Sequence, residues 1–144
     1  MKVVVQRSKY SKVVVDGKLI NEINNGLVLL VSFTHGDTID NILNMTKKIA
    51  NLRIFDDENG IMNKSILDTN GEILSISQFT LYADTKKGNR PSYIHALGGS
   101  EAIKLYEQFN YEMNKYCSTK PGVFGADMEL TITNDGPVTI IMEL

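Results

Sequence analysis

The sequence predicts a single domain of the α+β class that spans residues 1–144. Two observations set its size: the chain has 144 residues and 42% of them are hydrophobic, which suits one compact core and is too little for two domains. A third observation sets its class. Runs of β-branched residues are interspersed with two segments in which apolar residues recur at helical spacing.

The first part of the chain predicts a β-hairpin followed by a buried strand. Valine runs occupy residues 3–5 and 13–15, and the second run is followed by Asp16 and Gly17, the strongest short hairpin signal. A returning strand is expected through residues 19–20. Residues 26–33 are almost wholly apolar, which is typical of a central strand covered on both faces.

Two helices are predicted from the spacing of their apolar residues. Thr38 is a suitable N-cap for the first helix and Ser100 for the second. The apolar stripe of the first helix consists of Ile39, Ile42, Leu43, Thr46, Ile49 and Ala50. The stripe of the second consists of Ile103, Tyr106, Phe109, Met113 and Tyr116, an aromatic pattern that indicates a core-facing helix.

The remaining segments predict further strands and loops. Residues 56–60 are a polar turn, and residues 72–79 alternate as a strand that places Gln78 at its carboxyl end. Residues 83–99 form a long basic loop of the kind that is usually functional or disordered. Two final strands, at residues 126–133 and 138–143, are expected to be joined by a turn at Asn-Asp-Gly-Pro.

Composition argues against several classes of protein. Cys117 is the only cysteine, so neither a disulfide nor a thiolate metal site can form within one chain. No apolar run approaches the roughly 20 residues of a membrane span, and the first residues lack the features of a signal peptide. A cytoplasmic protein without membrane contact is therefore expected.

The charge distribution disfavours binding of nucleic acid by bulk electrostatics. The net charge is −2 and the isoelectric point is about 5.7. Local clusters of basic residues remain, and they would matter only if they flanked one pocket. These clusters are Arg7 with Lys9 and Lys12, Lys47 with Lys48, and Lys86 with Lys87 and Arg90.

Few side chains suggest conventional catalysis. The only histidines, His35 and His95, lie in separate loops, and neither has carboxylates at a metal-binding spacing, so neither a metal nor a cofactor is expected. Ser77 or Thr80 could act as a nucleophile if His95 folded back as a base, which would make a small-molecule esterase. A phosphate could bind at Gly98-Gly99-Ser100, but no Walker or dinucleotide pattern surrounds these residues.

Catalysis by main-chain groups is the other possibility. A chain that leaves a strand at Phe79 and Thr80 can point successive N–H groups into a cleft and stabilise a tetrahedral ester intermediate without an ionisable side chain. Gly136 and Pro137 suit recognition by backbone, because glycine leaves room for close approach and proline removes a donor. A hairpin turn is the alternative explanation of the same two residues, and the local sequence alone favours it over a site.

Three separated segments resemble the D-aminoacyl-tRNA deacylases, the D-tyrosyl-tRNA deacylase family. They are SQFTL at residues 77–81, GNRPS at 88–92 and NDGPVT at 134–139, and the similarity extends to VVQR at 4–7 and covers the whole chain. The resemblance implies an α+β fold in which antiparallel β-sheets form a barrel-like or sandwich core with two flanking helices. It also implies a homodimer.

The resemblance further implies a reaction. It is hydrolysis of the ester that joins a D-amino acid to the 3′ end of tRNA, or glycine mischarged on tRNA-Ala, as chiral proofreading in translation. The Gly136-Pro137 segment would be cis and would enter the partner's pocket, where its carbonyls exclude the side chain of an L-amino acid. Arg7 would anchor that segment.

The catalytic residues implied by the resemblance are Ser77, Gln78, Phe79 and Thr80. Two mechanisms are open: Thr80 acts as a nucleophile, or the N–H groups of Phe79 and Thr80 polarise the carbonyl while the ribose 2′-OH of tRNA assists. We favour the second because the sequence offers no base to activate Thr80. A non-catalytic RNA-binding module is the rival from another class, and it is disfavoured because no aromatic-basic RNA-binding motif is present.

Overall fold

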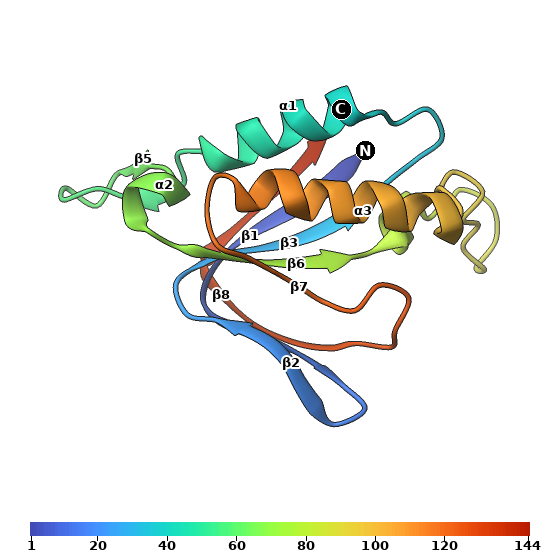
Figure 1. Ribbon diagram of the computed structural model, residues 1–144, viewed down its shortest axis with the longest axis horizontal. Coiled ribbons are helices and arrows are strands. Elements are labelled where there is room, and N and C mark those ends of the chain that lie inside the picture. Colours follow the sequence, from blue (N-terminus) through green and yellow to red (C-terminus); the bar gives the residue numbers. More distant parts are fainter.

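Two long antiparallel strands run through the computed structural model, which describes residues 1–144. Strand β1 (Lys2–Val15) pairs with β8 (Glu129–Glu143) from one end to the other, and the two chain termini lie side by side (Figure 1). Side chains of β1 point to opposite faces in turn, and Val3, Val5 and Val13 have no exposed surface. The two valine runs of the sequence therefore lie in a single strand.

The predicted hairpin is confirmed and is longer than expected. Asp16 and Gly17 form its turn with φ of 49° and 75°. The returning strand β2 (Lys18–Ile23) pairs with the second half of β1. The next strand, β3 (Gly26–Ser32), pairs with the first half of β1. β3 is almost entirely buried, as its apolar sequence predicts.

The predicted α+β class with two flanking helices is confirmed, but the sheet is mixed rather than wholly antiparallel. Its order is β2-β1-β3-β6-β7, with β8 also on β1. β6 (Glu72–Ser77) runs parallel to β3, and β7 (Thr119–Pro121) runs parallel to β6. The reason is topological: each of these pairs is connected through a long helix, and a crossover through a helix returns the chain in the same direction.

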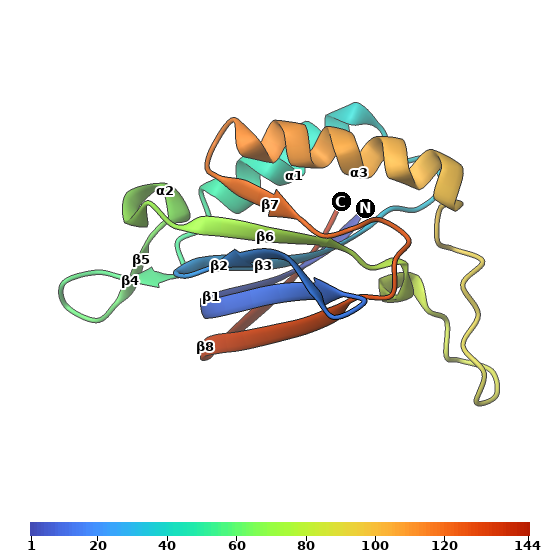
Figure 2. The same ribbon diagram turned by 60° about the horizontal axis from the view of Figure 1, so that its bottom comes forward.

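The crossover helices are α1 (Ile39–Ala50) and α3 (Gly99–Asn114), which lie together on one side of the sheet (Figure 2). Thr38 is the N-cap of α1, as predicted, and forms a capping box with Asn41. The prediction that Ser100 caps the second helix is wrong. Gly98 is the N-cap because its extended backbone (φ −61°, ψ 148°) already leads into the helix.

Three small elements complete the fold. The predicted polar turn joins the two-stranded ladder of β4 (Phe55–Asp56) and β5 (Met62–Lys64). A single-turn helix that the sequence did not indicate, α2 (Ile66–Thr69), precedes β6, and a 3₁₀ helix, η1 (Phe79–Tyr82), follows it. No helix is both long enough and apolar enough to cross a membrane.

The expected turn between two C-terminal strands is wrong, because both segments belong to β8. The residue pairs Gln6↔Thr139 and Ser8↔Asn134 enclose only Arg7 on β1, whereas residues 135–138 lie between them on β8. Both halves of β8 pair with the same strand in the same direction, so the chain bulges outward and does not reverse. Gly136 and Pro137 form the exposed part of this bulge, which we call the β8 bulge (residues 135–138).

Two apolar clusters fill the two faces of the sheet. The larger lies under the helices and includes Phe109, Met113, Ile42, Met45, Ile49 and Leu29. The smaller lies on the opposite face, where the sheet curls, and consists of Val13, Ile23, Val28, Leu74 and Ile76. β3 and β6 contribute to both clusters, and this fixes the position of the carboxyl end of β6, where the candidate site begins.

Candidate active site at the end of β6

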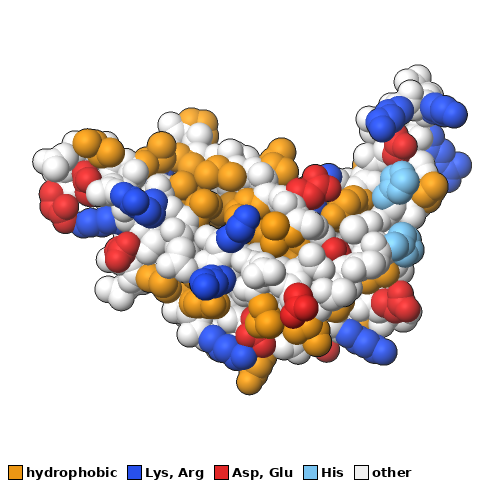
Figure 3. Space-filling view, turned by 90° about the horizontal axis from the view of Figure 1, so that it is seen from above, with side chains coloured by type: hydrophobic (Ala, Val, Ile, Leu, Met, Phe, Trp, Pro, Cys, Tyr) orange, Lys and Arg blue, Asp and Glu red, His pale blue; other side chains and the backbone are white.

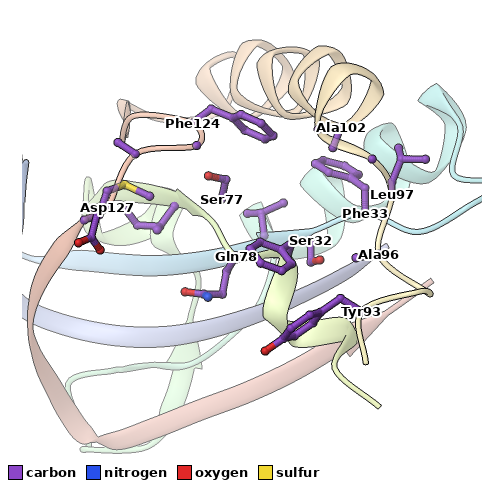
Figure 4. Close-up of a pocket in the computed structure, with 18 of the residues that line it drawn as sticks. Ser32, Phe33, Ser77, Gln78, Tyr93, Ala96, Leu97, Ala102, Phe124 and Asp127 are labelled. Atoms are coloured by element: carbon purple, nitrogen blue, oxygen red, sulfur yellow. The ribbon is translucent and has the colours of Figure 1, made fainter. Parts of the chain in front are cut away.

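A pocket of about 620 Å³ opens at the carboxyl ends of β3 and β6 (Figure 4). Its walls come from segments that are far apart in the sequence: the two strand ends, the start of α3, the loop at residues 124–128 and Tyr93. Most of the lining is hydrophobic. The exceptions include Ser32, Ser77, Gln78 and Asp127.

The end of β6 places three of the four predicted catalytic residues at this pocket. Ser77, Gln78 and Phe79 line it, and Thr80 follows directly in η1. The N–H of Gln78 donates to the carbonyl of Val31 on β3 (2.8 Å), which fixes the point where the chain leaves the sheet.

The backbone at the start of η1 offers free donors. The first helical hydrogen bond runs from the N–H of Leu81 to the carbonyl of Gln78 (3.2 Å). The N–H groups of Phe79 and Thr80 precede it and therefore have no acceptor within the helix. Two successive N–H groups beside a mostly apolar pocket are suited to hold a developing oxyanion.

The side chain of Thr80 is held by its neighbour and not by a base. Its hydroxyl accepts a hydrogen bond from the Gln78 amide at 2.5 Å. No imidazole, amine or carboxylate makes a hydrogen bond to that hydroxyl, so nothing in the chain would take its proton. Thr80 also lies outside the pocket lining.

The far end of η1 is held against β1. Lys2 donates to the carbonyl of Leu81 (3.4 Å), and its Nζ lies 4.7 Å from the centre of the Tyr82 ring. Burial, together with the nearby Asp37 and Glu143 carboxylates, raises the pKa of Tyr82 to about 12. Tyr82 therefore stays neutral at physiological pH and serves as a packing partner for Lys2.

The structure does not bring Ser77 and His95 together. The His95 ring is outside the pocket lining, is 60% exposed and lies 4.0 Å from the Asp84 carboxylate in its own loop. Burial raises the pKa of Cys117 to about 11, so that thiol is protonated at neutral pH. Neither a Ser/His pair nor a thiolate nucleophile is present.

The remaining predicted residues form a second group, away from the pocket. Arg7 lies opposite the β8 bulge, and its Nε is 3.3 Å from the Asp135 carbonyl and 3.2 Å from the Asp135 carboxylate. Its Nη1 donates to the carbonyl of Ile54 (2.7 Å) and to the Asp56 carboxylate (3.2 Å). Arg7 is 7% exposed, so these bonds satisfy a buried cation.

The bulge that Arg7 holds has a specific backbone. The Gly136-Pro137 peptide bond is cis, and Gly136 has a φ of 117°, a conformation that other residues rarely adopt. A side chain at position 136 would also come within 3.2 Å of the Arg7 guanidinium. None of Arg7, Gly136 and Pro137 lines the pocket of its own chain.

Sequence reasoning missed much of the pocket wall. Tyr93 packs edge-to-face on Phe79 with ring centres 5.1 Å apart, and Phe124 lies across the cavity (Figure 4). Ser32 ends β3 at the pocket and is buried. No motif marks these residues, because they come together only through the fold. The charged residues Lys86, Lys87 and Arg90 lie in the loop that leads to Tyr93.

Comparison with known proteins identifies the family. A family model described as D-Tyr-tRNA(Tyr) deacylase matches residues 4–143. A D-aminoacyl-tRNA deacylase of Clostridium tetani is 55% identical over 144 residues, which cover 99% of this chain and 97% of that protein. One of Clostridium novyi is 52% identical over 147 residues, with coverage of 99% and 97%.

Solved structures agree in fold. The c-Myc DNA unwinding element binding protein matches with a TM-score of 0.95 at 40% identity, covering 100% of this chain and 99% of that one. A probable eukaryotic D-amino acid tRNA deacylase matches with a TM-score of 0.85 at 16% identity, covering 99% and 98%. The chain is thus an enzyme of the hydrolase class. It belongs to the D-Tyr-tRNA(Tyr) deacylase family.

The contacts of Arg7 predict a large loss of stability when it is truncated. Arg7→Ala leaves the buried Ile54 carbonyl and the Asp135 carbonyl without their donor, and we expect the free energy of unfolding to fall by about 3 kcal/mol in a denaturant titration. Lys9→Ala is the matched control, because Lys9 pairs with the same Asp135 but is 68% exposed. That change should stay within about 0.5 kcal/mol. Equal losses would contradict the assignment.

Proposed function

We propose that the protein hydrolyses the ester bond of D-aminoacyl-tRNA, and of glycyl-tRNA mischarged on tRNA-Ala, as a chiral proofreading enzyme of cytoplasmic translation. The products are the free amino acid and tRNA. The observation that carries the proposal is the pair of N–H groups at Phe79 and Thr80, which lie beside an apolar pocket in a chain of this family. Such a site can activate an ester without a base of its own.

In the proposed reaction, water attacks the ester carbonyl carbon. The carbonyl oxygen becomes an oxyanion and is stabilised by the two N–H groups, which act without reorganising. The carbon–oxygen bond to the ribose then breaks, and the 3′-oxygen leaves with a proton relayed through the neighbouring 2′-OH. The Gln78 amide positions Thr80 by holding its hydroxyl, so Thr80 supports the backbone and does not attack.

The pocket walls suit the terminal adenosine of tRNA. Phe33, Phe79, Tyr93 and Phe124 supply aromatic surface around the cavity, and nucleobases stack on such surfaces. The basic loop that leads to Tyr93 would then contact the phosphates of the acceptor stem. This loop projects away from the body of the molecule (Figure 2), and the space-filling view shows Lys and Arg side chains on a projection at one end (Figure 3). It would provide affinity for tRNA in a chain of net negative charge.

A homodimer would complete the pocket. The β8 bulge is exposed and lies outside the pocket of its own chain, so it is available to the pocket of a second chain. In a twofold pair each bulge would enter the other pocket. The carbonyls of the partner's Gly136 and the partner's Pro137 would occupy the space that an L side chain needs, whereas a D-amino acid or glycine has only hydrogen there.

Chirality is the direct test of this function. Purified enzyme should release amino acid from D-Tyr-tRNA and Gly-tRNA at least 100-fold faster than from L-Tyr-tRNA, because exclusion by shape acts only on the L side chain (an order-of-magnitude expectation). The measurement is loss of label from the tRNA 3′ end under single-turnover conditions. Release from L-Tyr-tRNA at the D rate would refute the filter, and binding without release would favour an RNA-binding module.

The role of Thr80 can be separated from that of the ribose. Thr80→Ala removes a supporting hydrogen bond, so we expect the rate to fall by about tenfold, equivalent to about 1.4 kcal/mol. Replacing the terminal 2′-OH of the tRNA with hydrogen should instead lower the rate of wild-type enzyme by several powers of ten. A folded Thr80→Ala variant that binds substrate but shows no turnover would establish Thr80 as the nucleophile.

Assembly can be tested by dilution. If each pocket needs a bulge from a second chain, activity per protomer should fall as the protein is diluted through its dimer dissociation constant. Light scattering across the same concentrations measures the oligomeric state, and an inert carrier protein controls for adsorption. Constant activity per protomer in a monomeric sample would show that one chain is sufficient.

A further inference from the structure

The carboxyl end of β6 extends beyond one of the two strands that pair with it. The last residue pair between β6 and β7 is Ser75↔Pro121, and β6 continues to Ser77 without β7 beside it. On the other edge, pairing with β3 reaches Val31↔Ser77, and the N–H of Gln78 donates to the Val31 carbonyl (2.8 Å). Beyond Ser75, the strand end that leads into η1 is therefore paired with a neighbouring strand on one edge only.

The side chain of Tyr106 contacts β6 at the point where β7 ends. It extends from the middle of α3, and its hydroxyl donates to the carbonyl of Ser75 (2.7 Å) in a buried hydrogen bond. The same carbonyl accepts the N–H of Gly122, the residue after β7 (2.8 Å). Tyr106 is 3% exposed, so its hydroxyl acts in a region of low dielectric, where a hydrogen bond is strong.

The Tyr106 hydroxyl lies among polar groups from both ends of the stretch from Ser75 to Ser77. Burial has the largest effect on its pKa and raises it. Nearby polar groups lower the pKa by less, and these are the side chains of Ser75 and Asn110 and the N–H groups of Gly122 and Ser77. The phenol is therefore protonated at physiological pH and remains a hydrogen-bond donor.

The ring of Tyr106 makes a second contact, with a wall of the pocket. It packs against Phe124, with ring centres 5.7 Å apart and planes tilted by 43°. Phe124 lines the pocket, whereas Tyr106 does not (Figure 4). Tyr106 thus lies behind the pocket wall, and its effect on a reaction passes through residues that line the pocket. The hydroxyl contacts the strand end and the ring contacts the wall, so the two effects can be separated.

We propose that the Tyr106 hydroxyl is a positioning group for the end of β6. By fixing the Ser75 carbonyl, it sets the direction in which the chain leaves the sheet, just before the N–H groups of Phe79 and Thr80. Donors of this kind stabilise an oxyanion because they are held in place before the reaction, so a small displacement slows the chemical step. The inference rests on the proposed function, in which these donors hold the oxyanion.

Tyr106→Phe separates the two contacts, because it removes the hydroxyl and keeps the ring on Phe124. With D-Tyr-tRNA we expect kcat to fall about tenfold and KM to stay within about twofold, since the donors act in the transition state and the binding wall is retained. Steady-state rates are measured well below the Tm of the variant. A lower Tm with unchanged kcat would make Tyr106 a purely structural residue and overturn the proposal. A higher KM with unchanged kcat would also overturn it.

Thr46→Val is the matched control. Thr46 is 1% exposed, and its hydroxyl also donates to a main-chain carbonyl, that of Ile42 (2.9 Å), but in α1 and away from the pocket lining. The change should lower Tm about as much as Tyr106→Phe does and leave kcat and KM within about twofold of the wild type. An equal fall of kcat in both variants would show that lost stability slows the reaction, and the proposal would be wrong.

Amide hydrogen exchange tests the same contact without a substrate. In Tyr106→Phe, the N–H groups of Gln78 and Gly122 should exchange at least about tenfold faster, because their hydrogen bonds flank the strand end that the hydroxyl holds. Exchange at Leu29, in the middle of β3, should not change, and Thr46→Val should leave Gln78 and Gly122 unchanged. Unaltered exchange at both sites in Tyr106→Phe would refute the positioning role. If wild-type enzyme does not cleave D-Tyr-tRNA, the proposed function fails, and exchange still decides whether Tyr106 holds the strand end.

Discussion

The pairing of β1 with β8 on both sides of Arg7 is the constraint on which the rest of the structure depends. It holds β8 as one strand, although four residues, 135–138, face a single residue of β1. The extra residues of β8 must therefore leave the sheet. The Arg7 guanidinium fixes the position of this bulge, because it donates both to Asp135 and to the β4 segment at Ile54 and Asp56. A buried cation of this kind holds one backbone arrangement because each alternative leaves it unpaired.

This arrangement separates the predicted site residues of one chain into two groups. The strand end at Ser77 to Phe79 opens into the pocket, whereas the β8 bulge is exposed elsewhere on the surface. A twofold pair of chains is the simplest symmetry that can unite a pocket and a bulge twice over. The role proposed for the bulge would require rigidity, because a group that rejects a substrate by shape must keep its position when the wrong substrate contacts it.

Local signals in the sequence predicted local structure well. The Asp16-Gly17 hairpin and the Thr38 cap depend on neighbouring residues, and both are present. The β8 bulge could not be predicted, since its sequence is also a good turn and only pairing with Arg7, 128 residues away, decides between them. The parallel direction of β6 follows from a helical crossover. The pocket wall was missed because Ser32 and Tyr93 belong to no motif. His95 was considered as a base for Ser77 because it is near in the sequence, but the fold places its ring beside Asp84 instead.

The starts of two helices border the pocket. The start of η1 and the start of α3 both leave N–H groups ahead of the helical hydrogen bonds, and both border the same mostly apolar cavity. Neutral dipoles cost far less to bury there than a lysine or arginine would, and they do not titrate. A cavity without cations cannot attract a polyanion from a distance, however, so long-range attraction must come from outside it. In the proposed function this attraction comes from Lys86, Lys87 and Arg90, which lie on the loop that leads to Tyr93 at the pocket wall. The proposed function therefore separates attraction of tRNA, by charged residues outside the pocket, from ester hydrolysis, by backbone N–H groups beside it.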